Sequence, residues 1–188
     1  IHRDVKPENI LVGREGSVKL TDFGIAQIIG LESMTITGTL VGSPAHMSPE
    51  QIDGQVELDA RADIWALGTV LYAATTSGVL PFDSGTPHGV LKKIIDGRYE
   101  DPRRRSEHVD ASLATIIARC LVVDREARYS SVAELVSDLE AWLHERQMEP
   151  SEREIAAWMS DREGHQGAFG VRLVDILMQR ASAFESTG

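Results

Sequence analysis

Near its beginning the chain reads His2-Arg3-Asp4-Val5-Lys6-Pro7-Glu8-Asn9. This stretch places a carboxylate, an ammonium group and a carboxamide close together, at Asp4, Lys6 and Asn9. Asp4 could accept a proton from an attacking hydroxyl, and Lys6 could neutralise charge on a transferring phosphoryl group. Asn9 offers an oxygen ligand to a hard cation such as Mg²⁺. For any one of these residues alone, a solvated charged loop is the simpler interpretation.

Two β-prone runs follow, at residues 10–12 and 18–20, and the Gly-containing segment between them predicts a small β-hairpin. An Asp-Phe-Gly tripeptide begins at Asp22, directly after the second run. Asp22 would supply a second hard oxygen ligand, and the glycine would give the following loop conformational freedom. The tripeptide alone is uninformative, but its spacing from Asn9 across a hairpin indicates a shared site.

The rest of the chain predicts helices. The segment at about 60–76 is apolar on every side, which is typical of a buried helix, and Ser77-Gly78 would end it. A shorter helix is expected near 87–96, and apolar stripes at helical spacing predict two more over 113–121 and 132–143. In the last of these, Ser131 and Glu134 could each bond a free backbone N–H of the first turn. The predicted fold class is mainly α with a small β-hairpin.

Composition narrows the possible classes of protein. The 188 residues have a formal net charge of −10, which argues against a nucleic-acid partner because phosphate neutralisation needs clustered Lys and Arg. No apolar run reaches the roughly 18–20 residues that a membrane span needs. We expect a cytoplasmic location, with a membrane segment outside these residues as the open alternative. The single cysteine, Cys120, excludes an internal disulfide and lies on an apolar helix stripe, where we expect it to be buried.

Together these motifs resemble the eukaryotic-type (Hanks-type) serine/threonine protein kinase family. Three later stretches agree with the family in order. Residues 42–50 look like the end of the activation segment, 63–68 like the central buried helix of the large lobe, and 120–128 like the approach to the last helix. Residues 37–47 resemble bacterial members. The resemblance covers residues 1–145 and implies the C-terminal lobe of a kinase catalytic domain, and we interpret residues 146–188 as a helical appendage.

The resemblance implies a role for each matching residue. Asp4 would be the catalytic base, and Lys6 would contact the γ-phosphate of ATP. Asn9 and Asp22 would hold the Mg²⁺ ions that bridge the ATP phosphates. Lys6, together with Ser43 near the end of the activation segment, resembles the serine/threonine class. The implied cofactors are therefore ATP and Mg²⁺, and the implied substrate is a protein with Ser or Thr hydroxyls.

Further residues match structural and regulatory positions of the family. Glu50 would pair with Arg128, and Asp63 would hold the backbone of the catalytic loop, which the resemblance places at residues 2–9. Arg3 marks the type of kinase that is regulated through its activation loop, and Thr39 stands at the usual phosphorylated position. The alternative is that Thr39 is simply one hydroxyl of a flexible loop.

Two residues depart from the family pattern, namely His46 and Ser48, and Ser48 stands where Ala is common. His46 stands where the family usually has Tyr, in the region that would receive the substrate residue after the target hydroxyl. We therefore place His46 with Ser43 as a substrate-binding residue. A metal-binding role for His46 is less favoured than packing or hydrogen bonding, because no second His or Cys lies at ligand spacing.

Nothing in the 188 residues matches the small lobe of the family, since they contain no Gly-rich phosphate loop and no strand Lys for the phosphates. We therefore expect a large-lobe fragment of a kinase, inactive without its small lobe. The alternative is a non-catalytic kinase-like module that binds partners through its helices. The complete set Asp4, Lys6, Asn9 and Asp22 favours the enzyme.

Overall fold

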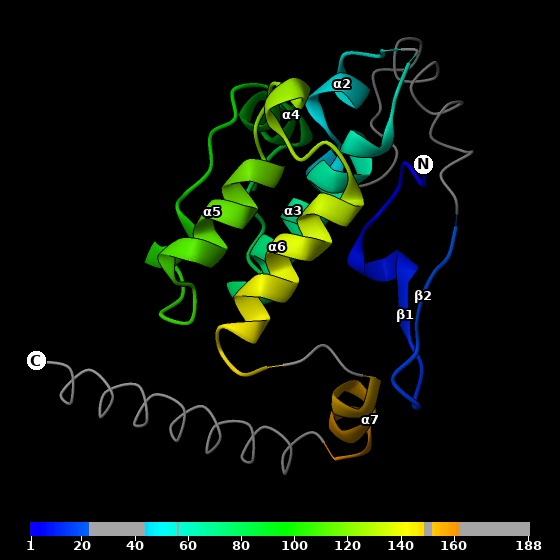
Figure 1. Cartoon of the computed structure of the whole chain (residues 1–188). Helices are drawn as coiled ribbons and strands as arrows, with labels where there is room; N and C mark the ends of the chain where they lie inside the picture. The colour runs from blue at the N-terminus through cyan, green and yellow to red at the C-terminus, as the bar shows by residue number, and fades with distance from the viewer. Residues whose placement is uncertain (23–43, 56, 149–151, 162–188) are drawn as a thin grey trace, which may run out of the picture. The chain divides into compact units, whose positions relative to one another are not determined.

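The computed structural model describes residues 1–22, 44–55, 57–148 and 152–161. These residues are mainly helical, with one two-stranded antiparallel sheet (Figure 1). The described elements are η1 (Pro7–Asn9), β1 (Ile10–Val12), β2 (Val18–Leu20), η2 (Pro44–His46), α2 (Pro49–Ile52), α3 (Ala60–Thr75), α4 (Pro87–Ile95), η3 (Pro102–Arg104), α5 (Ala111–Cys120), η4 (Arg125–Ala127), α6 (Val132–His144) and α7 (Glu152–Ser160). The predicted fold class, mainly α with a small β-hairpin, is confirmed.

The hairpin has the bounds that the two β-prone runs predicted. The N–H of Gly13 donates to the carbonyl of Ser17 at 2.8 Å, which closes the connection between β1 and β2. Gly16 in this connection has a φ of 85°, a conformation that glycine adopts without steric cost. The end of β2 is tied back to the start of β1, because the N–H of Thr21 donates to the carbonyl of Asn9 at 2.9 Å.

The predicted buried helix is α3. Asp59 caps its N-terminus by accepting a hydrogen bond from the N–H of Arg61 at 2.8 Å. At the other end Gly78, with a φ of 87°, donates its N–H to the carbonyl of Ala73 at 2.8 Å. This glycine cap satisfies a carbonyl that the last turn leaves open, and it ends the helix where Ser77-Gly78 predicted.

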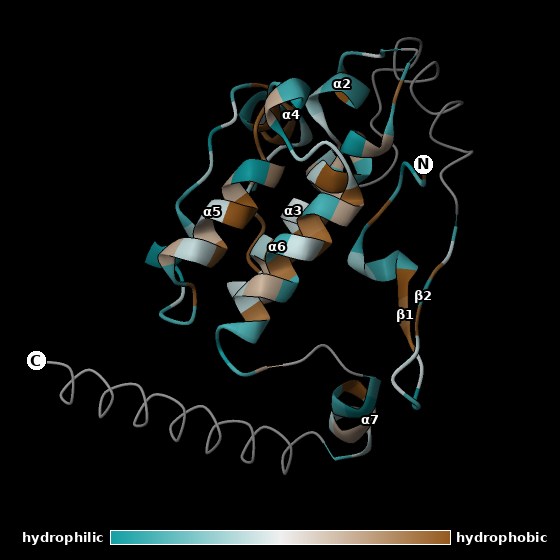
Figure 2. Cartoon of the chain, viewed as in Figure 1, coloured by the Kyte–Doolittle hydropathy of each residue, from teal (hydrophilic) through white to brown (hydrophobic). Residues whose placement is uncertain are grey.

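The hydrophobic core includes Ile64 and Trp65 of α3, Leu113 and Ile117 of α5, and Leu135 of α6. Figure 2 shows hydrophobic residues on all three helices. Gly68 allows α3 and α5 to approach closely, because a Cβ at this position would come within 2.5 Å of the Cβ of Cys120. Cys120 is fully buried, as predicted, and burial raises the pKa of its thiol to about 12. The helix interface therefore depends on a small residue in α3.

The start of α6 differs in one detail from the prediction. The hydroxyl of Ser131 accepts the N–H of Glu134 at 3.2 Å, as expected. The carboxylate of Glu134 instead accepts the N–H and the hydroxyl of Ser130, at 2.9 and 2.8 Å. The expected return bond to the first turn was wrong, because the chain before the helix presents two donors one residue earlier.

The chain divides into two compact units. The first comprises residues 1–10 and 20–139, and the second comprises residues 11–19 and 140–188. All described candidate site residues lie in the first unit, and α7 lies in the second. The predicted boundary between residues 145 and 146 stays a prediction. None of the described helices combines the length and the apolar character that a bilayer crossing requires.

Candidate active site

Asp4, Lys6 and Asn9 come together in the turn that leads into β1. Pro7 begins the short helix η1, and the N–H of Asn9 donates to the carbonyl of Lys6 at 3.0 Å, which folds the segment back on itself. The ammonium group of Lys6 donates to Oδ2 of Asp4 at 2.8 Å. Nδ2 of Asn9 donates to the same Oδ2 at 3.0 Å and to the backbone carbonyl of Asp4 at 2.8 Å. The Asp4 carboxylate is thus oriented by two donors.

The three side chains differ in their access to solvent. Asn9 is buried, whereas the side chains of Asp4 and Lys6 are 18% and 31% exposed. Both charged groups are held in place and remain accessible, so a reacting group that arrives from the solvent can contact them. The described hydrogen bonds of the Asn9 side chain use its nitrogen, so its Oδ1 is the atom that it can offer to a cation.

The backbone before Asp4 is held by α3. The carboxylate of Asp63 accepts the N–H of His2 at 2.8 Å and the N–H of Arg3 at 2.7 Å. Arg3 has a φ of 71°, a left-handed conformation that costs a non-glycine residue about 1–3 kcal/mol. The contact that the family resemblance implied for Asp63 is therefore present, and it stabilises a strained peptide.

His2 links this loop to the segment that precedes Asp22. The buried imidazole donates from Nε2 to the carbonyl of Thr21 at 3.0 Å, and its Nδ1 accepts the N–H of Asp4 over a longer 3.4 Å. This pattern assigns the proton to Nε2. Sequence reasoning gave His2 no role, although its place beside Asp4 was a signal. Asp22 itself is exposed and has a φ of 57°.

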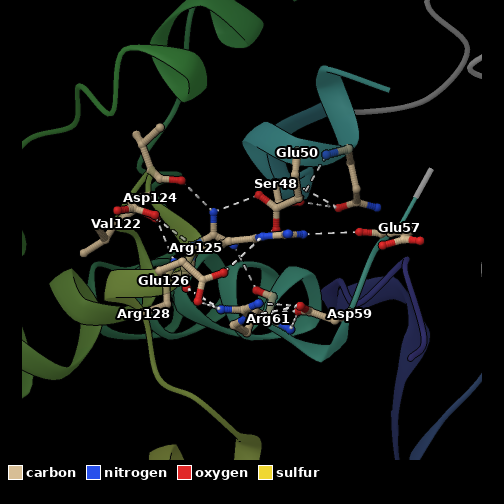
Figure 3. Close-up of polar contacts among 12 residues, drawn as sticks. Ser48, Glu50, Glu57, Asp59, Arg61, Val122, Asp124, Arg125, Glu126 and Arg128 are labelled. Carbon is tan, nitrogen blue, oxygen red and sulfur yellow. Dashed lines mark hydrogen bonds and ion pairs between the residues drawn. The ribbon is translucent and has the colours of Figure 1, made fainter. Parts of the chain in front are cut away.

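Glu50 and Arg128 form a buried ion pair (Figure 3). The guanidinium donates to both carboxylate oxygens, at 2.7 and 2.8 Å, and its remaining N–H groups reach the carbonyls of Arg61, Val122 and Val123. Burial raises the pKa of Glu50, but the hydrogen bonds and charge of Arg128 outweigh it and keep the pKa below its ordinary value. This pair is structural, because it joins α2, which contains Glu50, to the segment between η4 and α6, which contains Arg128.

His46 is bonded to α3 through Thr69. Its Nδ1 lies 2.6 Å from the hydroxyl of Thr69, and that hydroxyl donates to the carbonyl of Ala66 at 2.7 Å. The imidazole therefore donates from Nδ1. Burial lowers the pKa of His46; Glu8 and Asp4 oppose this shift, while Lys6 adds to it. These charged side chains belong to residues 4–8, so the His46 imidazole lies within electrostatic range of the loop that carries Asp4. No sequence signal pointed to Thr69.

Several predicted site residues lie outside the described residues, namely Ser43 and Thr39, together with the Phe and Gly that follow Asp22. Within the described part of the chain, no group of three or more His, Cys, Asp or Glu side chains could hold a metal. The oxygen donors of Asn9 and Asp22 are nevertheless of the hard type that Mg²⁺ prefers, so these residues fit the predicted cation.

The sequence pattern of the protein kinase domain matches residues 1–140. The chain belongs to the protein kinase family. It is 41% identical over 140 residues to the probable serine/threonine-protein kinase CPE1738 of Clostridium perfringens, and these residues cover 74% of this chain and 20% of that protein. It is also 34% identical over 186 residues to the serine/threonine-protein kinase PknB of Mycobacterium leprae, which covers 96% of this chain and 29% of the relative.

A third similar kinase is PknB of Mycobacterium tuberculosis, 38% identical over 141 residues, which cover 74% of this chain and 22% of that kinase. The predicted resemblance to bacterial kinases of the Hanks type is confirmed. This kinase chain spans less than a third of the length of the curated relatives it matches.

Proposed function

We propose that this chain forms the part of a serine/threonine protein kinase that receives the protein substrate and activates its hydroxyl. The proposal rests on one observation: the Asp4 carboxylate is oriented by Lys6 and Asn9 while it stays accessible. The reaction is the transfer of the γ-phosphate of ATP to a protein Ser or Thr. The membership of the kinase family and the similarity to serine/threonine-protein kinases support this assignment.

Each residue of the loop then has a task. Asp4 accepts a hydrogen bond from the substrate hydroxyl, orients it and takes its proton as the new P–O bond forms and the bond from the γ-phosphorus to the leaving ADP oxygen breaks. Lys6, whose ammonium group lies 2.8 Å from that carboxylate, places a positive charge where the transferring phosphoryl group becomes most negative. Asn9 holds Asp4 through Nδ2, and with Asp22 it would hold Mg²⁺. When bound, ATP supplies the phosphoryl group and Mg²⁺ neutralises part of its charge.

The substrate side of the site would include Ser43 and His46. Bonding to Thr69 orients the His46 ring from α3. Its charged neighbours belong to the catalytic loop, which supports a place for His46 beside the peptide that carries the target hydroxyl. Because the reaction consumes ATP, we place it in the cytoplasm.

We further propose that the activity is switched on by a phosphate on Thr39. Among the described residues, the Arg3 guanidinium forms no ion pair, whereas its backbone is held by Asp63. A phosphate offers an anionic partner of the kind that an Arg fork bonds well, and such a contact would join Thr39 to the loop that carries Asp4.

The experiment identifies which amino acids of an acceptor protein are phosphorylated by the native protein that contains this chain. Incubation with Mg²⁺, γ-labelled ATP and a basic acceptor protein is expected to give phosphoserine and phosphothreonine. The 188 residues carry no recognisable small-lobe motif, so the same chain alone is expected to give none. Phosphotyrosine as the main product would contradict the proposal, and no transfer at all would favour a non-catalytic binding module.

A further inference from the structure

The peptide of Arg3, which directly precedes Asp4, is held at both of its ends. Its N–H donates to Oδ1 of Asp63 at 2.7 Å. Its carbonyl accepts from Nε2 of Gln51 at 2.9 Å, across 48 positions of the sequence. With a φ of 71° at Arg3, this stretch is strained and would relax if either contact were lost.

The Gln51 side chain is itself fixed at its other end. Its Oε1 accepts the N–H of Ser48 at 3.0 Å and the hydroxyl of Ser48 at 3.1 Å. The backbone N–H of Gln51 returns to the Ser48 hydroxyl over 3.4 Å, so the two residues form the capping box of α2. Gln51 and Ser48 are 4% and 0% exposed. The carboxamide therefore has one orientation, with its oxygen toward Ser48 and its nitrogen toward Arg3.

We propose that Gln51 is a positioning residue for the catalytic base, because it holds the Arg3 carbonyl and thereby sets the direction of the chain at Asp4. This inference rests on the proposed kinase function. Gln51 thus has a second task besides capping α2. This task involves the same part of the chain as His46, because α2 follows η2. The segment that contains η2 and α2 is thus connected to the loop that carries Asp4 through the buried side chain of Gln51.

The effect on catalysis should be larger than the effect on binding. Loss of the Gln51 donor leaves a carbonyl without its partner and frees the peptide between Arg3 and Asp4 to rotate. A displacement of about 1 Å in a reacting group can slow a reaction by roughly a hundredfold. Lys6 and Asn9 still hold the carboxylate, so we expect a smaller loss, of about tenfold or more in kcat.

The test compares two variants of the native protein. Gln51→Glu keeps the oxygens that accept from Ser48 but removes the N–H groups that donate to Arg3. Ser48→Ala weakens the same capping box and leaves the Gln51–Arg3 bond in place. We expect kcat to fall about tenfold or more in Gln51→Glu, with KM for ATP within about twofold of wild type, and kcat within about twofold in Ser48→Ala.

Gln51→Met, which has similar length and no donor or charge, replaces Gln51→Glu if the buried carboxylate prevents folding. Equal kcat in the folded Gln51 variant and wild type would overturn the proposal, as would an equal loss of kcat in Ser48→Ala. Failure of both Gln51 variants to fold would also overturn it, because the role would then be structural.

Hydrogen exchange separates this inference from the proposed function, because it needs no activity. The amides of residues 1–9 are expected to exchange about tenfold faster in the Gln51 variant than in Ser48→Ala. If the wild-type protein transfers no phosphate, the proposed function fails, and the exchange rates alone decide whether Gln51 holds the loop. Unchanged exchange would contradict the positioning role whatever the activity.

Discussion

At Arg3 the chain adopts a left-handed backbone directly before the proposed catalytic base, and Asp63 and Gln51 hold it there from two different helices. Strain of this kind persists only where surrounding contacts over-determine the conformation. The buried Arg128–Glu50 ion pair likewise depends on the contacts that surround it. Burying both groups is costly, but five hydrogen bonds from the guanidinium satisfy the pair and join distant segments.

His46 gives a prediction about pH. Burial lowers its pKa below 6.5, so the unfolded chain binds more protons than the folded one as the pH falls below about 6.5. The stability that depends on the neutral imidazole is therefore present at neutral pH and is lost on acidification from 6.5 down to the lowered pKa. His46→Gln keeps an N–H donor for Thr69 and does not titrate. We expect its melting temperature to fall less than that of wild type between about pH 7.5 and 5.5.

Thermal unfolding of both proteins at the two pH values measures this difference. The other histidines are common to both, so their contributions cancel in the comparison. An equal fall in melting temperature for His46→Gln and wild type would show that the buried imidazole does not make this contribution.

At the scale of elements, α3 is the element that organises the site. Asp63 near its start holds the catalytic loop, and Thr69 farther along holds His46 of η2. On its other side, Gly68 lies against Cys120 of α5. A change in how α3 packs on α5 would therefore be transmitted to both parts of the site.

Gly68→Ala is expected to destabilise the fold. The new Cβ would lie 2.5 Å from the Cβ of Cys120 and 3.0 Å from Cδ2 of Leu121, so the helices must separate. Overpacking costs about 1–3 kcal/mol, and a contact of 2.5 Å between two Cβ atoms places this variant toward the upper end, above the gain of about 1 kcal/mol that Ala brings to a helix. Gly85→Ala is the matched control, because a Cβ there meets nothing within 4 Å. Denaturant unfolding that finds both variants as stable as wild type would contradict this packing.

The elements were predictable where the pattern is local. The apolar character of α3, the apolar spacing along α5 and α6 and the turn between β1 and β2 depend on neighbouring residues, and these predictions are confirmed. The cluster of Asp4, Lys6 and Asn9 was also predictable, because these residues are close together in the sequence. The Ser48–Gln51 capping box carried a recognisable signature, but the bond from Gln51 to Arg3 joins segments that only tertiary packing brings together.

For the molecule as a whole, the described site lies in one compact unit, residues 1–10 with 20–139. The kinase domain pattern covers nearly the same residues, 1–140. The loop, α2 and α3 are joined there by hydrogen bonds that span 48–61 positions of the sequence. We therefore expect a change in the chemistry of Asp4 to affect turnover without affecting the fold.

Asp4→Asn in the native protein tests the central claim most directly. Asn has nearly the same shape and can still accept from Lys6, but it cannot take a proton from the substrate hydroxyl. At saturating Mg²⁺ and ATP, kcat for Ser/Thr phosphorylation is expected to fall by about 10²- to 10⁴-fold, with the melting temperature nearly unchanged. A folded Asp4→Asn protein whose kcat stays within about threefold of wild type would contradict the account.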